Sequence, residues 1–121
     1  MTKLEIIEET ANYYNINNWA GGPRLGQGLG VCFYTNFDNT KQCAVGRCLK
    51  NPTGLNGTIK SLMDSKKIQN EDFKPEYQNH DVDFWIDLQV FHDAKYNWTL
   101  TGISEEGLEY KKQLIEKYKN N

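Results

Sequence analysis

The side chains with the greatest potential for chemistry in this chain are Cys32, Cys43, Cys48 and His92. Three thiolates and one imidazole can hold a tetrahedral zinc ion. A cysteine with a neighbouring histidine as base can also act as a nucleophile. However, the spacing of Cys43 and Cys48 lies at the edge of the range for a zinc knuckle, and nothing in the sequence places His92 beside a thiol. We therefore expect no metal, no cofactor and no catalytic residue, with a zinc-binding domain and a Cys/His-dependent enzyme kept as alternatives.

A second group of residues suits the binding of a small anionic ligand. Arg47 follows Gly46 at the predicted end of a strand, from where a guanidinium can fork onto phosphate or carboxylate. The alternative for Arg47 is an ion pair with one of the sixteen acidic residues. The candidate ligand-binding residues are Arg47, Arg24, Trp19, Tyr34, Lys41, His92 and Trp98. Aromatic rings stack nucleobases, so these residues predict capture of a nucleotide without turnover.

The segment from Trp19 to Gly30 holds five glycines and one proline. Backbone N–H groups can surround an anion where side chains do not intrude, which suits a glycine-rich loop. This loop precedes a predicted strand and lacks a Lys-Ser/Thr pair, so it matches neither a P-loop nor a dinucleotide fingerprint. It is either a lid that carries Trp19 and Arg24 over a ligand or a plain surface loop.

Local signals predict the helices that must position these residues. Thr2 and Glu5 match a capping box, which starts a short amphipathic helix. A short helix is expected over 58–63, and an apolar stripe predicts a core helix over 81–93. Ser104 is the expected N-cap of a last helix, with Leu108, Leu114, Ile115 and Tyr118 on its buried face.

Strand-forming residues over 31–35, turn residues over 36–40 and a second strand over 42–45 predict a β-hairpin. The expected fold is α+β, with a small antiparallel β-sheet (the hairpin near residues 31–46) packed against three to four helices. The whole chain, 1–121, is expected to form a single domain. A chain of this length can bury roughly two thirds of its unfolded surface, enough for a hydrophobic core.

Composition narrows the classes of partner. The net charge is −2 and the pI is about 5.7, which gives no basic surface for nucleic acid. A small phosphorylated ligand needs only two or three cations. The acidic N-terminal segment does not suit a signal peptide, and no apolar run is long enough for a bilayer. We expect a cytoplasmic protein with reduced cysteines, no membrane partner, and a homo-oligomer that forms its pocket between subunits.

Two segments, Cys32-Phe33-Tyr34 with Cys43-Ala44-Val45-Gly46, and Leu88-Gln89-Val90-Phe91-His92-Asp93 followed by Trp98, carry a family resemblance. The chain from Val31 onward resembles a widespread group of small, mostly uncharacterised phage and prophage proteins. Those look like single domains of about this size. The resemblance implies a phage-encoded accessory protein in the host cell cytoplasm, and many such proteins antagonise bacterial defence, some by sequestering nucleotide second messengers. It assigns no residue roles.

Together these observations predict a non-enzymatic protein that binds and sequesters a small nucleotide-derived signal molecule. The first alternative is a direct protein–protein inhibitor of a host defence enzyme. Its contact surface would be the Glu-rich first helix and the acidic face formed by Asp81, Asp83 and Asp87. The second alternative is the Cys/His enzyme or zinc-binding domain considered above.

Overall fold

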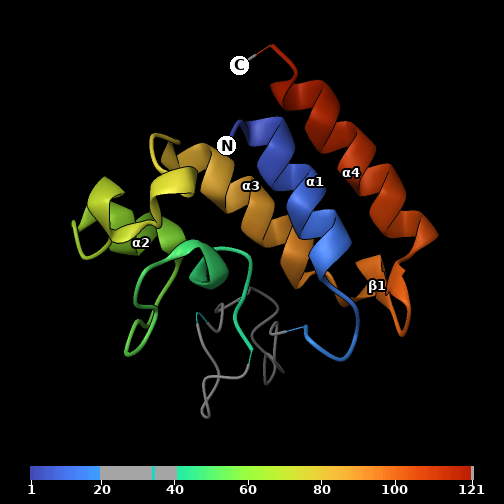
Figure 1. Ribbon diagram of the computed structural model, residues 1–121, viewed down its shortest axis with the longest axis horizontal. Helices are drawn as coiled ribbons and strands as arrows, with labels where there is room; N and C mark the ends of the chain where they lie inside the picture. Colours follow the sequence, from blue (N-terminus) through green and yellow to red (C-terminus); the bar gives the residue numbers. More distant parts are fainter. Residues whose placement is uncertain (20–33, 35–40, 121) are drawn as a thin grey trace.

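The computed structural model describes residues 1–19, 34 and 41–120. Within these residues the chain forms four α-helices and one two-stranded antiparallel sheet, which confirms the α+β class. The elements are α1 (Lys3–Tyr13), α2 (Ile59–Asp64), α3 (Val82–Asp93), β1 (Trp98–Thr99), β2 (Gly102–Ile103) and α4 (Glu105–Tyr118). Figure 1 shows α1 between α3 and α4, with α2 on the other side of α3. None of the described helices is long and apolar enough to cross a membrane.

The predicted helix starts are confirmed. Thr2 Oγ1 accepts a hydrogen bond from the Glu5 N–H at 3.1 Å, and the Thr2 N–H donates to Glu5 Oε1 at 2.7 Å. The Ser104 hydroxyl accepts from the Gly107 N–H at 3.0 Å and caps α4 in the same way. These bonds satisfy backbone donors that have no partner inside the helix, so a local sequence pattern is enough to set where each helix begins.

The hydrophobic core is built around α3, as its apolar stripe predicts. Phe84, Trp85, Leu88 and Phe91 are completely or almost completely buried. On α4 one expectation was wrong, because Leu108 is 49% exposed rather than buried. Gly107 takes the inward position instead, since a Cβ there would lie only 2.4 Å from the carbonyl oxygen of Asn97.

The prediction of a hairpin near residues 31–46 was wrong for its second strand, because the residues after Cys43 do not form a strand. Residues 44–45 form a turn and Gly46–Cys48 a 3₁₀ helix, η1. The Val45 N–H donates to the side chain of Gln89 at 3.3 Å, and the Arg47 N–H donates to the Cys43 carbonyl at 2.9 Å, so neither is available to a strand partner. Apart from Tyr34, the first strand lies outside the described residues. The described sheet is elsewhere and pairs Trp98 with Ile103 and Thr99 with Gly102.

A backbone bridge joins two segments that are far apart in the sequence. Leu49 pairs with Phe73 in an isolated antiparallel bridge. The Lys50 N–H donates to the Asp72 carbonyl and the Lys74 N–H donates to the Cys48 carbonyl, each at 2.9 Å. The segment that follows Arg47 is thereby held against the segment that contains Lys74.

Candidate functional site

The bridge creates a surface groove of about 340 Å³ beside η1. Its lining residues are Tyr13, Gln42, Gly46, Arg47, Leu49, Lys50, Pro52 and Lys74. This volume falls within the range of small-molecule sites, roughly 300–1,000 Å³. Among the described residues, the lining contains three cations and no carboxylate, which is unusual in a chain of net charge −2. We call it the cationic groove.

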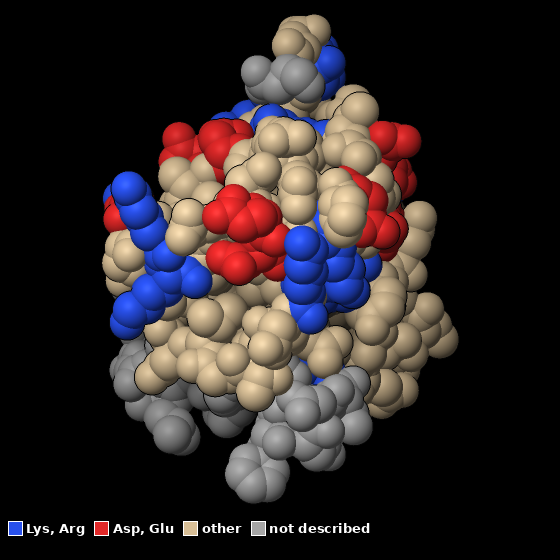
Figure 2. Space-filling model, turned by 60° about the vertical axis from the view of Figure 1, so that its left-hand side comes forward, with Lys and Arg blue, Asp and Glu red and all other residues tan. Residues whose placement is uncertain are grey.

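Two of the cations in this groove are available to a ligand. Lys50 and Lys74 are exposed. Within the part of the chain that the structure describes, neither ammonium forms an ion pair with a carboxylate. In Figure 2 the basic atoms on the face shown lie in small groups beside acidic ones and form no continuous basic surface. Such a distribution suits a compact anion better than a long polyanion.

Arg47 is largely covered by its neighbours. Its Nη2 lies 2.8 Å from Glu9 Oε1, and its Nη1 donates to the Tyr77 hydroxyl at 3.2 Å. The Tyr77 hydroxyl in turn donates to the same Glu9 oxygen. The guanidinium carbon lies 4.8 Å from the centre of the Tyr13 ring, and the side chain is only 12% exposed. The ion pair that the sequence allowed as an alternative is therefore present.

The protonation states in this cluster follow from its contacts. Partial burial acts to raise the pKa of Glu9, but the hydrogen bonds from Tyr77 and Arg47 outweigh it and lower that pKa. Burial and the bond to Glu9 raise the pKa of Tyr77 to about 12. At neutral pH Glu9 is thus an anion, and Tyr77 keeps the proton that it donates.

Trp19, His92 and Trp98, three other predicted site residues, meet at the carboxyl end of α3. The indole N–H groups of Trp19 and Trp98 both donate to the carbonyl of His92, at 2.8 and 2.9 Å. Asn97 donates to the neighbouring carbonyl of Phe91 at 2.8 Å. The last carbonyls of a helix lack partners within it, so these side chains cap α3.

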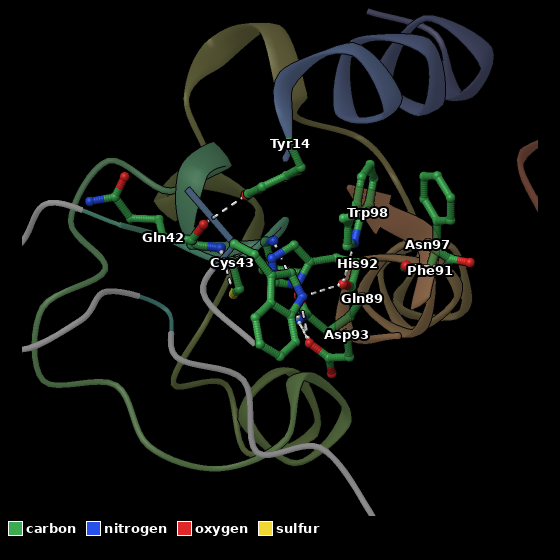
Figure 3. A network of polar contacts seen from close by, with 12 residues as sticks. Tyr14, Gln42, Cys43, Gln89, Phe91, His92, Asp93, Asn97 and Trp98 are labelled. Atoms are coloured by element: carbon green, nitrogen blue, oxygen red, sulfur yellow. Dashed lines mark hydrogen bonds and ion pairs between the residues drawn. The ribbon is translucent and has the colours of Figure 1, made fainter. Parts of the chain in front are cut away.

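The imidazole of His92 is fully buried in the network drawn in Figure 3. Its Nδ1 lies 3.1 Å from Asp93 Oδ1, which also accepts from Gln89 Nε2 at 2.7 Å. The Tyr14 ring packs against the imidazole with 4.5 Å between ring centres. In this view His92 lies between Cys43 and Trp98, inside the protein rather than in the cationic groove.

The structure places three of the predicted ligand-binding residues in the interior, away from the cationic groove. His92, Trp98 and Tyr34 are buried, and the Tyr34 hydroxyl donates to the Gly57 carbonyl at 3.0 Å. Trp19 is half-buried and caps α3, while Lys41 is half-buried and adjacent in sequence to the groove residue Gln42 without lining the groove itself. Arg24 and the glycine-rich segment after Trp19 lie outside the described residues. Among the predicted site residues that the structure describes, Arg47 alone lines the groove.

We predict that the two indoles act together on the His92 carbonyl. Trp98→Phe should lower the free energy of unfolding by about 1 kcal/mol, because Trp19 still donates to that carbonyl. Trp19→Phe with Trp98→Phe should cost more than the sum of the single variants, because the acceptor loses both donors. Urea denaturation of the four proteins measures this coupling. Additivity within about 0.3 kcal/mol would contradict a shared cap.

The cysteines differ from one another, and the expectation of reduced thiols was wrong for Cys43. Cys43 is disulfide-bonded, whereas Cys48 is a buried free cysteine. Burial raises the pKa of the Cys48 thiol to about 12. A disulfide sulfur is neither a thiolate nucleophile nor a zinc ligand, and among the described residues no group of His, Cys, Asp and Glu could hold a metal ion. The geometry favours neither the enzyme nor the zinc alternative.

The Cys48 thiol should be inert in the folded protein. At pH 8 its alkylation by iodoacetamide should be at least ~100-fold slower than that of free cysteine, because both the thiolate population and access are small. Mass spectrometry of timed samples measures the rate. Alkylation in urea is the control and should be rapid. Fast modification of the folded protein would contradict this description of Cys48.

Sequence reasoning missed Glu9, Tyr13, Lys50 and Lys74. Lys50 lies three residues after Arg47, and this proximity was the one local signal available. Lys74 reaches the groove only through the bridge between Leu49 and Phe73, which no local pattern indicates. Glu9 and Tyr13 are four residues apart on α1, so one helix face brings both to Arg47.

No family model matches the chain, and searches among curated proteins and solved structures found no match either.

Proposed function

We propose that this protein binds a small phosphate-bearing ligand in the cationic groove and holds it without turnover. The observation that carries the proposal is the lining itself, in which Arg47, Lys50 and Lys74 converge. No carboxylate is among the described residues of this lining, and Glu9 pairs with Arg47 from outside it. Charge-assisted hydrogen bonds from two or three such cations are sufficient to hold a phosphate. The lining residues that the structure describes include no pair of groups suited to nucleophilic or acid–base catalysis, which supports binding rather than turnover.

A nucleotide-derived ligand fits this groove best. Tyr13 at its wall is 45% exposed, and Arg47 covers one face of its ring with the guanidinium carbon 4.8 Å from the ring centre. A nucleobase would stack on the remaining aromatic surface. Stacking on Tyr13 and charge pairing with Lys50 and Lys74 would act on the two different ends of a nucleotide. This arrangement supports sequestration of a nucleotide signal.

The biological role in this proposal follows from the resemblance to phage proteins. A phage-encoded accessory protein that sequesters such a signal in the host cytoplasm would blunt a bacterial defence, and a homo-oligomer could bind several ligands at once. The Cys43 disulfide opposes a reducing compartment, because disulfides persist mainly in oxidising ones. Trapping thiols with an alkylating agent in freshly lysed cells tests the location: a reduced Cys43 supports the cytoplasm, and an oxidised Cys43 contradicts it.

Isothermal titration against cyclic dinucleotides, cyclic trinucleotides and ADP-ribose derivatives tests the function. At least one of them should bind with micromolar affinity or better, and native mass spectrometry should find it unchanged after incubation. Absence of binding across the panel, together with no small molecule that co-purifies with the protein, would overturn the proposal.

A second hollow of about 530 Å³ favours one other function, direct inhibition of a host protein. It is lined by Glu8, Glu105, Leu108, Glu109, Lys111, Lys112 and Ile115. The exposed Leu108 among three carboxylates could meet a basic partner with an apolar centre. The acidic face expected on α3 is less available, because Asp81 pairs with Lys3 and Asp87 pairs with Lys117. A stoichiometric partner captured from bacterial lysate and lost with Leu108→Lys would favour this function over the first.

A further inference from the structure

We infer that Glu9 is a built-in competitor for the ligand, because its carboxylate occupies the edge of Arg47 that a phosphate group would take. This inference rests on the proposed function of the cationic groove. It assigns separate roles to the cations. Lys50 and Lys74 contact the ligand first, and Arg47 binds it only after the Glu9 carboxylate has been displaced.

The contacts of Arg47 leave little of its guanidinium open to the groove. Glu9 Oε1 lies 2.8 Å from Nη2, and Nη1 is bonded to the Tyr77 hydroxyl. Both Nε and Nη2 are buried, and neither makes a well-aligned hydrogen bond to any described residue, so the contact of Nη2 with Glu9 is an ion pair. A forked contact of an anion with Arg47 uses two neighbouring guanidinium nitrogens, and one that includes Nη2 requires the Glu9 carboxylate to move.

Glu9 is the member of the pair that can move. Its side chain is 36% exposed, three times the 12% of Arg47, so a displaced carboxylate would turn directly into water. Arg47 is retained by the Tyr13 ring, 4.8 Å from the guanidinium carbon, and by its bond to Tyr77. The cation thus stays in position when the carboxylate leaves.

The exchange defines the class of ligand. A ligand that replaces Glu9 must supply oxygen acceptors to Arg47 and must also interact favourably with Lys50 and Lys74. Replacing one anion by another at Arg47 alone contributes little binding free energy. A single carboxylate or a chloride ion does not meet this condition. A ligand with two linked or neighbouring phosphate groups does, since one can face the lysines while the other replaces the Glu9 carboxylate.

Inorganic pyrophosphate is a direct probe of this competition. Glu9→Gln keeps the size of the side chain and its ability to accept hydrogen bonds but removes the charge, so it should tighten pyrophosphate binding about tenfold in isothermal titration. Glu8→Gln is the matched control. Glu8 is the preceding residue on α1, pairs with Lys111 at 2.9 Å and does not line the groove, so its neutralisation should change affinity less than twofold.

The outcomes separate this inference from the function on which it rests. Tighter binding by Glu9→Gln with little change in Glu8→Gln supports the competitor role. Unchanged or weaker binding by Glu9→Gln, while the unaltered protein binds pyrophosphate, overturns that role and leaves the groove's function standing. If neither protein binds pyrophosphate, the competitor role is overturned, and the function of the groove is decided by the nucleotide panel. Should Glu9→Gln fail to fold by circular dichroism, Glu9→Asp replaces it, because the shorter carboxylate withdraws from Nη2 and should tighten binding to a smaller degree.

Discussion

Replacing Gly46 with alanine should lower the free energy of unfolding by at least about 4 kcal/mol. For a marginally stable domain, such a loss leaves a large fraction of the molecules unfolded. A Cβ at this position would lie 1.9 Å from the carbonyl oxygen of Tyr34 and 2.7 Å from its Cα. Both are backbone atoms, so no rotation of a side chain relieves the clash. Urea denaturation followed by circular dichroism measures the loss.

Gly54→Ala is the matched control for this prediction. A Cβ at Gly54 would meet no atom within 4 Å, although the backbone has φ of +79°. It should therefore cost only about 1 kcal/mol, from the left-handed conformation alone. Equal losses for the two variants would show that the close approach of Gly46 to Tyr34 does not hold this part of the fold together.

Removing both exposed lysines of the groove should weaken binding of a phosphate ligand by about 30-fold, which corresponds to two charge-assisted contacts of moderate strength. The variant is Lys50→Ala with Lys74→Ala. Because both side chains are exposed, the free energy of unfolding should change by less than about 0.5 kcal/mol. Isothermal titration with the tightest ligand of the panel measures the affinity.

A double variant at α4, Lys112→Ala with Lys119→Ala, controls for the loss of two positive charges. Both lysines are exposed, Lys112 on α4 and Lys119 as the residue that follows it, and neither lines the groove. Their removal should weaken binding less than twofold, because solvent and salt screen charges at this separation. If the α4 variant loses as much affinity as the groove variant, the ligand responds to overall charge and the groove is not its site.

The helical part of the fold was predictable because its signals are local. Thr2 and Ser104 cap their helices through bonds to residues three positions ahead, and the apolar spacing over 81–93 indicates the buried face of α3. Leu108 was misplaced because the choice between Leu108 and Gly107 depends on contact with the Asn97 carbonyl, which lies in the preceding segment.

The prediction of a second hairpin strand was wrong because contacts with distant residues outweigh the strand propensity of this segment. Gln89 takes the Val45 N–H, and the tight approach of Gly46 to Tyr34 leads into a 3₁₀ helix. The prediction of the candidate site was incomplete for the same reason, because contacts between distant segments decide which residues meet. Arg47 was found from its position, yet Lys74 joins it across the Leu49–Phe73 bridge. Trp98 was chosen as an aromatic ring, but its N–H is used on the His92 carbonyl.

An NMR titration of the ¹⁵N-labelled protein tests the central claim most directly, because it locates the ligand as well as detecting it. With the tightest ligand of the panel, or with pyrophosphate, the largest shifts should fall on the amides of Gln42, Gly46, Arg47, Lys50 and Lys74, which line the groove. Shifts concentrated on the α4 hollow around Glu105, Leu108 and Lys112, or no shifts at saturating ligand, would contradict binding in the cationic groove.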